Sequence, residues 1–516
     1  MGGLGRLAAT LGAAIVVSGC SASAPTVAPA TATPVTPPPT ASAGAAHSPS
    51  RAARPAAQRS LGGRPMLDCT IGSGLSGLCG TLDVPEDRAD LGGRKVGLHV
   101  VVVPAQAVTP ASDAEFGLAG GQGAAGTTLL TWMPGTFTEI HATRDIVLID
   151  QRGTGGSNQV PMPASPDTAG VSSAAADAAW SAWARDLLEP LETDPRMYTS
   201  SMAADDIDAV RAALGYEQID LYGPSYGATL GQYYLRQHGD RVRVAVFDGG
   251  TPLDVPIFER MAPNSQRALD LVLDRCAADS GCNAAFPAVR RELRDLLERL
   301  EVPGTTTITD PATGKPGVLT RDDITSAIHS LLVDASSAAS LPLAIHSVYR
   351  GDWEAVAALR SSLGGSDAPG NPLMSSVIRC SEAWARFDPD EVARIGSGSY
   401  DRDAQVAMAR EQEALCRYLP KGVVPANDAD PVRTDVPVLW VVGEADPQDP
   451  PANLAAVAGQ MPNGRIVVVP GQGHTVGHLG CMPAILAAFI ARGDTAGLDA
   501  SCIDRGGVPV PAFARP

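Results

Sequence analysis

The chain has 516 residues, more than a single plain domain needs, so we expect a core fold with a sizeable insertion. Its formal net charge is −17 at pH 7, and no cluster of Lys and Arg residues forms a basic patch. The sequence therefore argues against nucleic-acid binding and mildly favours neutral or cationic substrates. Nine cysteines less Cys20 leave eight, an even number that suits disulfides in an exported protein.

The first twenty residues have the pattern of a targeting segment. Arg6 is their only charged residue, and an apolar run from Leu7 to Val17 follows it. Val17-Ser18-Gly19-Cys20 resembles a bacterial lipobox, which predicts a signal peptide at 1–19 and a lipid on Cys20. The alternative is an ordinary secretory signal that is cut near Ala22 or Ala24. Either interpretation predicts an extracytoplasmic protein, anchored to the membrane in the first case and secreted in the second.

Residues 20–65 are rich in Ala, Pro, Thr and Ser and contain almost no large apolar side chain. Such a segment cannot bury a core, so it is predicted to be a disordered tether. No later apolar run is long enough to cross a bilayer. The lipid anchor is therefore the only membrane contact that we expect.

Residues 66–252 alternate between strand and helix patterns. Strands are predicted at Lys95–Pro104, Phe116–Leu118, Asp145–Asp150, Gln218–Tyr222 and Val242–Asp248, and helices at Met202–Leu214 and Ala228–Leu235. This alternation predicts an α/β fold with a mostly parallel sheet and helices on both faces.

Helical patterns dominate residues 253–430. Amphipathic helices are predicted at Arg267–Ala277, Pro287–Leu300, Asp322–Leu332, Leu341–Tyr349 and Trp353–Leu363. Strand patterns return at Val436–Val442 and Arg465–Val469. We therefore expect a helical lid at 253–430 between the two halves of the sheet, a second core segment at 431–505 and a tail at 506–516. An independent helical domain is the alternative.

The pentapeptide Gly223-Pro224-Ser225-Tyr226-Gly227 lies between a predicted strand and a predicted helix. A Gly-x-Ser-x-Gly at such a turn is the nucleophile elbow of α/β-hydrolases. The turn forces the serine into strained backbone angles, and side chains two residues away on either side would clash. Ser225 is therefore the predicted nucleophile.

The acid and the base should follow the serine in chain order. Asp446 and His474 each come just after a predicted buried strand, where α/β sheets place their ligands. A histidine is needed to take the serine proton, and an acid to orient the imidazole. His478 is the alternative base, and the alternative acids are Glu444 and Asp449.

An oxyanion intermediate needs two backbone N–H donors. Tyr226, directly after the nucleophile, is predicted to give one, and Gly121, in the glycine loop after the Phe116 strand, the other. No His/Cys cluster has zinc-ligand spacing, and the glycine loops at 72–74 and 153–157 have no Walker lysine. We therefore expect neither a metal nor a cofactor.

The stretch from Cys69 to Cys502 resembles the secreted tripeptidyl aminopeptidases, within the prolyl-iminopeptidase-like α/β-hydrolases. The resemblance rests on six short blocks: Cys79-Gly80-Thr81-Leu82-Asp83-Val84-Pro85, Asp150-Gln151-Arg152-Gly153-Thr154-Gly155, Tyr222-Gly223-Pro224-Ser225-Tyr226-Gly227, Gly443-Glu444-Ala445-Asp446-Pro447, Gly473-His474 and the terminal Cys481 and Cys502. It implies the release of short peptides from free N-termini by a triad of Ser225, Asp446 and His474. It also implies the disulfides Cys69–Cys79, Cys276–Cys282, Cys380–Cys416 and Cys481–Cys502.

Two positions depart from the pattern of that family. Gln122 stands where the oxyanion loop usually has proline, and Asp449 where threonine is common. Related aminopeptidases use lid acids to bind the substrate ammonium group, and Glu382, beside Cys380, is the predicted residue for that role. Glutamate is more often simply a solvated surface acid.

We thus expect an exported serine hydrolase, most simply an aminopeptidase that releases short peptides. A carboxylesterase or lipase would use the same triad. An inactive surface-binding lipoprotein is the remaining hypothesis.

Overall fold

The computed structural model describes residues 59–72, 74–133, 135–160, 162–164, 166, 172–301, 306–309, 316–352 and 371–515. The predicted signal peptide, Cys20, most of the tether and the predicted helix Trp353–Leu363 lie outside these ranges and stay predictions. Within the described ranges, no helix has the length and apolar character that a membrane span requires.

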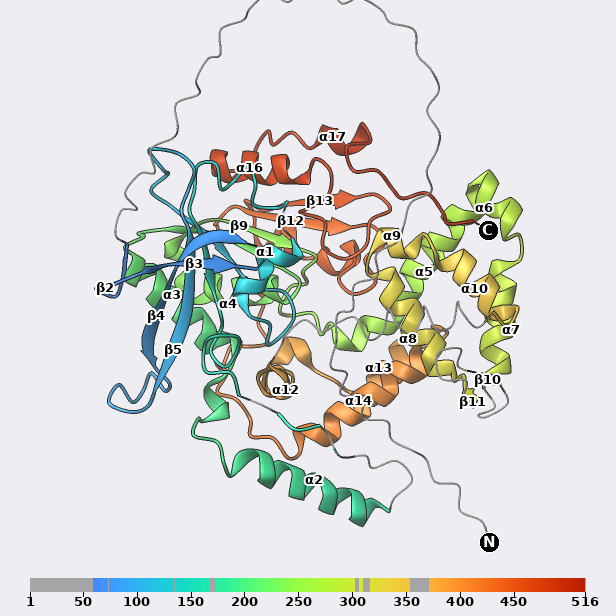
Figure 1. Cartoon of the computed structure of the whole chain (residues 1–516). Helices are drawn as coiled ribbons and strands as arrows, with labels where there is room; N and C mark the ends of the chain where they lie inside the picture. Colours follow the sequence, from blue (N-terminus) through green and yellow to red (C-terminus); the bar gives the residue numbers. More distant parts are fainter. Residues whose placement is uncertain are drawn as a thin grey trace, which may run out of the picture. The chain divides into compact units, whose positions relative to one another are not determined.

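A central sheet organises the described chain (Figure 1). Its strands are β3 (Leu67–Ile71), β4 (Leu75–Pro85), β5 (Lys95–Val103), β6 (Glu115–Gly117), β7 (Ile146–Ile149), β8 (Ile219–Pro224), β9 (Val242–Asp248), β12 (Val438–Gly443) and β13 (Arg465–Val469). They are ordered β13-β12-β9-β8-β6-β7-β5-β4-β3. Pairs from β13 to β7 are parallel, and pairs from β7 to β3 are antiparallel. The predicted mostly parallel sheet is confirmed, whereas β3 and β4 were not foreseen.

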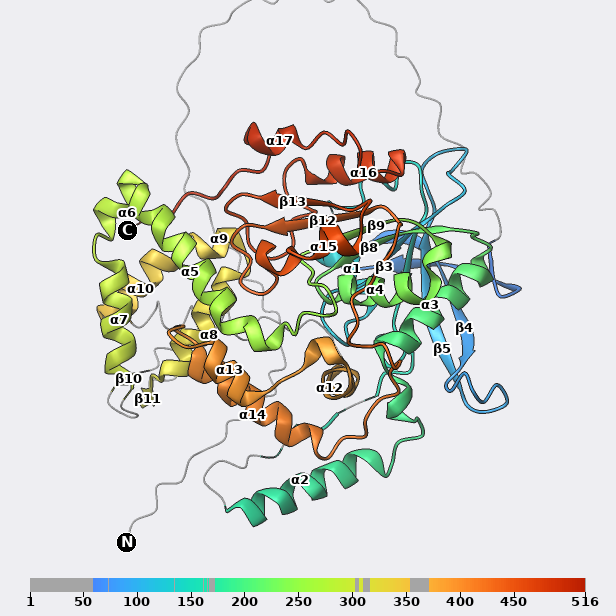
Figure 2. The same cartoon turned by 180° about the vertical axis from the view of Figure 1, so that it is seen from behind.

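Helices cover both faces of the sheet (Figures 1 and 2). In β9, Ala245 and Phe247 share a core with α3 (Ser200–Leu214) and α4 (Tyr226–His238). The alternate residues Val244 and Val246 share the opposite core with α16 (Met482–Arg492). Because both faces of β9 are buried, its residues from Val244 to Phe247 are all apolar instead of alternating with polar ones.

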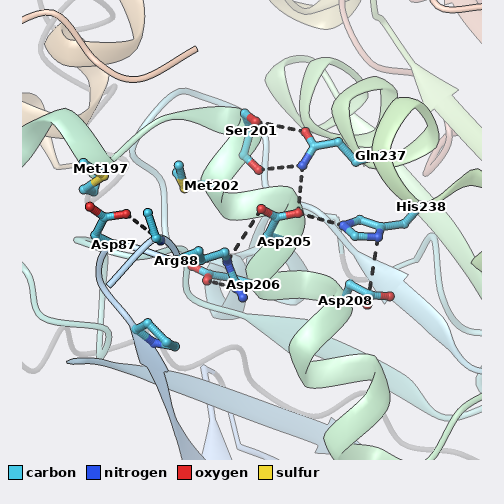
Figure 3. Close-up of polar contacts among 12 residues, drawn as sticks. Asp87, Arg88, Met197, Ser201, Met202, Asp205, Asp206, Asp208, Gln237 and His238 are labelled. Carbon is cyan, nitrogen blue, oxygen red and sulfur yellow. Dashed lines mark hydrogen bonds and ion pairs between the residues drawn. The ribbon is translucent and has the colours of Figure 1, made fainter. Parts of the chain in front are cut away.

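Polar contacts fasten α3 to α4 away from the strand ends (Figure 3). The ring of His238 bonds Asp205 at 2.9 Å, and Gln237 donates to the same carboxylate oxygen. Arg88 donates to Asp206 at 2.7 Å, and its Nε lies 3.6 Å from Asp205. The His238–Asp205 pair thus joins two helices. The nearby Ser201 hydroxyl donates to Gln237 and not to a histidine. The cluster is therefore structural.

The helical lid leaves the core after β9 and returns at β12. These strands are neighbours, with Val438 opposite Ala245, so the insertion joins two halves of one sheet as predicted. Its helices are α5 (Met261–Ala278), α6 (Ser280–Ala285), α7 (Val289–Arg299), α8 (Arg321–Leu332), α9 (Ala335–Ala338), α10 (Leu341–Tyr349), α12 (Pro372–Ser381), α13 (Pro389–Ile395) and α14 (Arg402–Cys416). Residues of α5, α7, α8 and α10 form an apolar core of their own.

The lid also includes a segment that the sequence placed in the core. Helix α2 (Ser173–Leu188) packs beside α14, where the Trp180 and Tyr418 rings stack with centroids 6.1 Å apart. The Tyr418 hydroxyl donates to Asp177 at 2.9 Å. Two tryptophans on one helix need apolar cover, and the end of α14 supplies it.

Both ends of the described chain are more ordered than predicted. Strands β1 (Ser60–Leu61) and β2 (Arg64–Pro65) precede the expected start of the core at residue 66, and Leu61 is buried. At the other end, the Arg275 guanidinium lies 4.5 Å from the centre of the Phe513 ring. The expected tail at 506–516 therefore packs on the folded chain: Phe513 is buried in the apolar core of the lid, and Val508 is buried in the core that includes α16.

The four disulfides implied by the family resemblance are present. They join Cys69 to Cys79, Cys276 to Cys282, Cys380 to Cys416 and Cys481 to Cys502. The first lies between the paired strands β3 and β4, and the third ties α12 to α14. Helix α12 is thus covalently fixed to the rest of the lid.

Candidate active site

Ser225 occupies a strained turn between β8 and α4. Its backbone has φ 52° and ψ −124°, angles that L-residues adopt only where the surroundings impose them. A side chain at Gly223 would lie 2.3 Å from the carbonyl oxygen of Gly227, and one at Gly227 would lie 2.4 Å from that of Leu118. The Ser225 N–H donates to the Asp248 carbonyl at 2.8 Å. The predicted nucleophile elbow is therefore present, and its glycines are required.

His474 and Asp446 are brought together by the strands that precede them. Asp446 follows β12, His474 follows β13, and the two strands are parallel neighbours. His474 Nδ1 lies 2.9 Å from Asp446 Oδ2. The other oxygen of Asp446 accepts the backbone N–H groups of Gln448 and Asp449, at 2.8 and 2.9 Å. Asp446 is fully buried, so its carboxylate is held in one orientation.

Two of the alternative residues, His478 and Glu444, do not form such a pair, and the third, Asp449, lies farther from His474 than Asp446 does. The buried Nδ1 of His478 has no hydrogen-bond partner among the described residues. Glu444 instead accepts the N–H of Gly471 at 2.9 Å and so stabilises the turn after β13. The geometry favours His474 and Asp446.

The end of β9 connects the nucleophile to the histidine loop. Ser225 bonds to Asp248, and a side chain at the next residue, Gly249, would lie 3.1 Å from His474 Nδ1. The Asp248 carboxylate also accepts the N–H groups of Val476 and Gly477, at 2.7 and 2.8 Å. Ser225 and His474 therefore share one edge of the sheet.

Sequence reasoning missed two positioning groups. Asp248 receives a third hydrogen bond, from the Tyr222 hydroxyl at 2.6 Å, and so anchors the histidine loop to the sheet. An acid at the end of a buried strand was a signal available in the sequence. The lid supplies the second group, because the His474 N–H donates to the carbonyl of Val333 at 2.7 Å. A backbone carbonyl carries no sequence signal.

Three carboxylates set the protonation of His474. Burial disfavours the imidazolium, but Asp446, Asp449 and Asp248 together raise the pKa of His474 to about 9. Burial likewise opposes ionisation of Asp446, but the attraction and hydrogen bond of His474 hold the pKa of that carboxyl below its usual range. Each member of the pair therefore favours the charged form of the other.

Asp449 places a second carboxylate close to His474. Its Oδ2 lies 3.7 Å from His474 Nδ1, and its Oδ1 accepts the Thr251 hydroxyl at 2.6 Å. Burial and repulsion by Asp446 raise the pKa of Asp449 to about 7. Ligand atoms of Asp446, Asp449 and His474 lie within 4.8 Å of one another, close enough for a cation. A cation on Nδ1 would replace the proton that bonds to Asp446, so this arrangement suits an acid–base role better.

A cavity of about 160 Å³ lies beside the nucleophile. Its walls come from the glycine loop, the elbow, the loop after β9, the lid and the loop after β12: Gly121, Gln122, Ser225, Tyr226, Thr229, Thr251, Pro252, Val255, Ile257, Phe258, Arg379, Trp384, Gln448 and Asp449. Both predicted oxyanion donors, Tyr226 and Gly121, therefore line the wall that contains Ser225. A larger groove of about 500 Å³ among α5, α7 and α8 includes none of the predicted triad residues.

Glu382 does not line this cavity. Its side chain is buried, and its carboxylate accepts the N–H and the hydroxyl of Ser200, at 2.7 and 2.8 Å, and the Trp384 indole N–H at 2.7 Å. Burial raises the pKa of Glu382 to about 7. These contacts oppose both the predicted ammonium-binding role and the alternative of a solvated acid, because they make Glu382 part of the framework behind Tyr226 and Trp384.

The fold and the site define a serine hydrolase of the α/β-hydrolase superfamily. The model of the alpha/beta hydrolase fold family matches residues 132–480, and the chain belongs to that family. It is 27% identical over 337 residues to serine protease Hip1 of Mycobacterium tuberculosis, and the same figures hold for Hip1 of Mycobacterium bovis. The match covers 58% of this chain and 60% of the relative, so it spans less than two thirds of those proteins.

Solved structures of similar proteins include the proline iminopeptidase of Mycobacterium smegmatis. It is 16% identical, covers 81% of this chain and 99% of its own, and has a TM-score of 0.37. A proline iminopeptidase-related protein of Thermus thermophilus is 19% identical, covers 80% of this chain and 96% of its own, and has a TM-score of 0.35.

Proposed function

We propose that this protein is an exported serine peptidase that releases short peptides from free N-termini through an acyl-enzyme on Ser225. The observation that carries the proposal is the buried His474–Asp446 pair at the sheet edge where Ser225 stands in its strained turn. The similarity to a serine protease supports peptide bonds as the target.

In the proposed mechanism, neutral His474 takes the proton of the Ser225 hydroxyl through Nε2 as the oxygen attacks the scissile carbonyl. Asp446 keeps the proton on Nδ1 and stabilises the imidazolium. The N–H groups of Tyr226 and Gly121 stabilise the developing oxyanion. Tyr226 is the first residue of helix α4, so the positive end of the helix dipole also lies near the oxyanion. His474 then protonates the leaving amine, and water attacks the acyl-enzyme by the same route in reverse.

Asp449 replaces Glu382 as the proposed partner of the substrate ammonium group. It is a carboxylate that lines the cavity beside Ser225, whereas both oxygens of Glu382 are already occupied. The cavity volume of about 160 Å³ supports a small acyl group and hence cleavage close to a peptide end.

Export and anchoring are part of the proposal. Four disulfides suit an oxidising compartment, and the lipobox-like sequence at Cys20 provides the anchor. Mass spectrometry of the mature N-terminus tests this part. We expect a diacylglyceryl cysteine at Cys20, and a mature chain that begins beyond Cys20 would favour simple secretion.

A substrate panel tests the activity. Purified protein should hydrolyse chromogenic di- and tripeptide amides with free N-termini much faster than the same peptides with an acetylated N-terminus. Val255, Ile257 and Phe258 in the cavity wall would also suit an ester acyl chain, so small p-nitrophenyl esters belong in the panel. Hydrolysis of esters with no turnover of any peptide would make the protein a carboxylesterase.

A further inference from the structure

Helix α12 presents Arg379 to the cavity beside the nucleophile. The helix is held firmly at both ends. At its start, the Asn371 N–H donates to the Gly123 carbonyl at 2.7 Å, which attaches the lid to the glycine loop. At its end, Cys380 is bonded to Cys416 of α14. Arg379 therefore occupies a defined place in the cavity wall.

The guanidinium of Arg379 has no polar partner within the described chain. Its Nε is buried without a hydrogen bond, and no described carboxylate lies within 4.0 Å of the group. Arg386, further along the lid, behaves differently, because it donates to both oxygens of Glu259, at 2.7 and 3.3 Å. Arg379 instead lies 5.4 Å from the centre of the Phe258 ring.

An unpaired, partly desolvated cation reduces stability unless something outside the chain pairs with it. Burial alone shifts the pKa of Arg379, and it lowers that pKa, so no nearby acid compensates. The aromatic ring orients the planar group but supplies no hydrogen-bond acceptor. A guanidinium held in this way is arranged to receive a carboxylate through two parallel hydrogen bonds.

We propose that Arg379 binds a carboxylate of the substrate, so that the enzyme selects acidic peptides. The carboxylate belongs either to an acidic side chain next to the scissile bond or to the free C-terminus of a short peptide. The inference deepens the proposed function and relies on Ser225 as the nucleophile, because it is the shared cavity that brings the carboxylate close to the scissile bond.

Matched substrate pairs test the proposal in the full-length protein. Comparing the hydrolysis of Ala-Ala-Glu p-nitroanilide with that of Ala-Ala-Gln p-nitroanilide tests whether Arg379 binds an acidic side chain. Comparing tetra-alanine with its C-terminal amide tests whether Arg379 binds a free C-terminus. The wild type should prefer the acidic member of at least one pair. Arg379→Met should lower kcat/KM for that member by at least about thirtyfold, while the neutral member changes by less than about threefold.

Stability separates recognition from a structural role. Arg379→Met should leave the Tm unchanged or raise it, because it removes an unpaired and partly buried charge. The matched control Arg386→Met should lower the Tm, because it leaves Glu259, which is 3% exposed, without its partner. Arg379→Lys should recover part of the acidic preference, since a charge remains without the planar fork.

An ester pair distinguishes this inference from the proposed peptidase activity. If no peptide is cleaved, but p-nitrophenyl hydrogen adipate is hydrolysed faster than p-nitrophenyl hexanoate in an Arg379-dependent way, the peptidase proposal fails and the carboxylate site stands. A wild type with no acidic preference in any of the three pairs would overturn the inference. The inference would also be overturned if Arg379→Met lowered kcat/KM equally for both members of every pair.

Discussion

The two sides of the cavity differ in how their polar groups are satisfied. On the core side, Asp446 accepts two backbone N–H groups as well as the His474 bond, and Asp248 accepts three hydrogen bonds. On the lid side, Arg379 has no partner among the described residues. The core thus fixes the reacting groups in one geometry, whereas the lid keeps a charged group available.

This difference separates chemistry from selection. Groups that move protons must be held within a fraction of an ångström, and the strand ends of a parallel sheet provide that precision. A group that recognises a substrate must remain unpaired until the substrate arrives. We infer that the core determines the reaction, and that the lid, through Arg379, adds a selection among substrates to the ammonium contact proposed for Asp449.

Removing a core residue should have the largest effect. Ser225→Ala and His474→Ala should each lower kcat/KM by about 10⁴- to 10⁶-fold on every substrate, because both residues act in the same proton transfer. Steady-state kinetics on one ester and one free peptide amide measure this loss.

The matched control for the base is His478→Ala, which should keep most of the activity because His478 pairs with no described carboxylate. The reverse pattern, with His478→Ala inactive and His474→Ala active, would assign the base to His478 and contradict the core geometry described above.

A substitution of Glu382 tests the hydrogen bonds that connect it to Ser200 and Trp384. Glu382→Gln should destabilise the protein by about 1–3 kcal/mol, because an amide nitrogen would face one of the donors that now bond to the carboxylate. Thermal or urea unfolding measures the loss. Any fall in kcat/KM should be equal for free-N-terminal peptides and neutral esters. A loss confined to the peptides would restore Glu382 as an ammonium-binding residue.

Substituting Asp449 should have the smallest effect on kcat/KM for a neutral ester, but it tests directly how a neighbouring carboxylate changes the pKa of His474. The base must be neutral, so kcat/KM rises with pH through the raised pKa of His474. Asp449→Asn removes a negative charge that raises that pKa. The rising limb of the pH profile should therefore move to lower pH, as measured with a neutral ester above pH 7, where Asp449 is ionised.

The same variant should lower kcat/KM for peptides with a free N-terminus, since the proposed ammonium partner is gone. Asp449→Thr, which also removes the negative charge, should shift the limb in the same direction. An unchanged pH profile would mean that the charge of Asp449 does not affect the pKa of His474.

The sequence predicted the elbow and the order of serine, acid and histidine because these features are local. Gly-x-Ser-x-Gly constrains five consecutive residues, and Asp446 and His474 each follow an apolar strand. The expected strands at β5, β7, β9 and β13 agree with the structure to within about a residue or two for the same reason.

Features that depend on long-range contacts were missed. Helix α2 carries a modest apolar pattern, and only its packing with Tyr418 places it in the lid. Glu382 was assigned from its position beside Cys380, but its role depends on Ser200, which is far away in the sequence. The unpaired state of Arg379 had no signal at all, because the absence of a partner is a property of the folded chain.

The most direct test of the account is to trap the acyl-enzyme. The protein is mixed with a free-N-terminal tripeptide p-nitroanilide, quenched in acid within milliseconds and analysed by peptide mass spectrometry. We predict a peptidyl adduct on Ser225 that is absent in Ser225→Ala, because the serine hydroxyl is the group that the acyl chain is transferred to. Turnover of the peptide without an adduct on Ser225, or an adduct on another residue, would contradict the account.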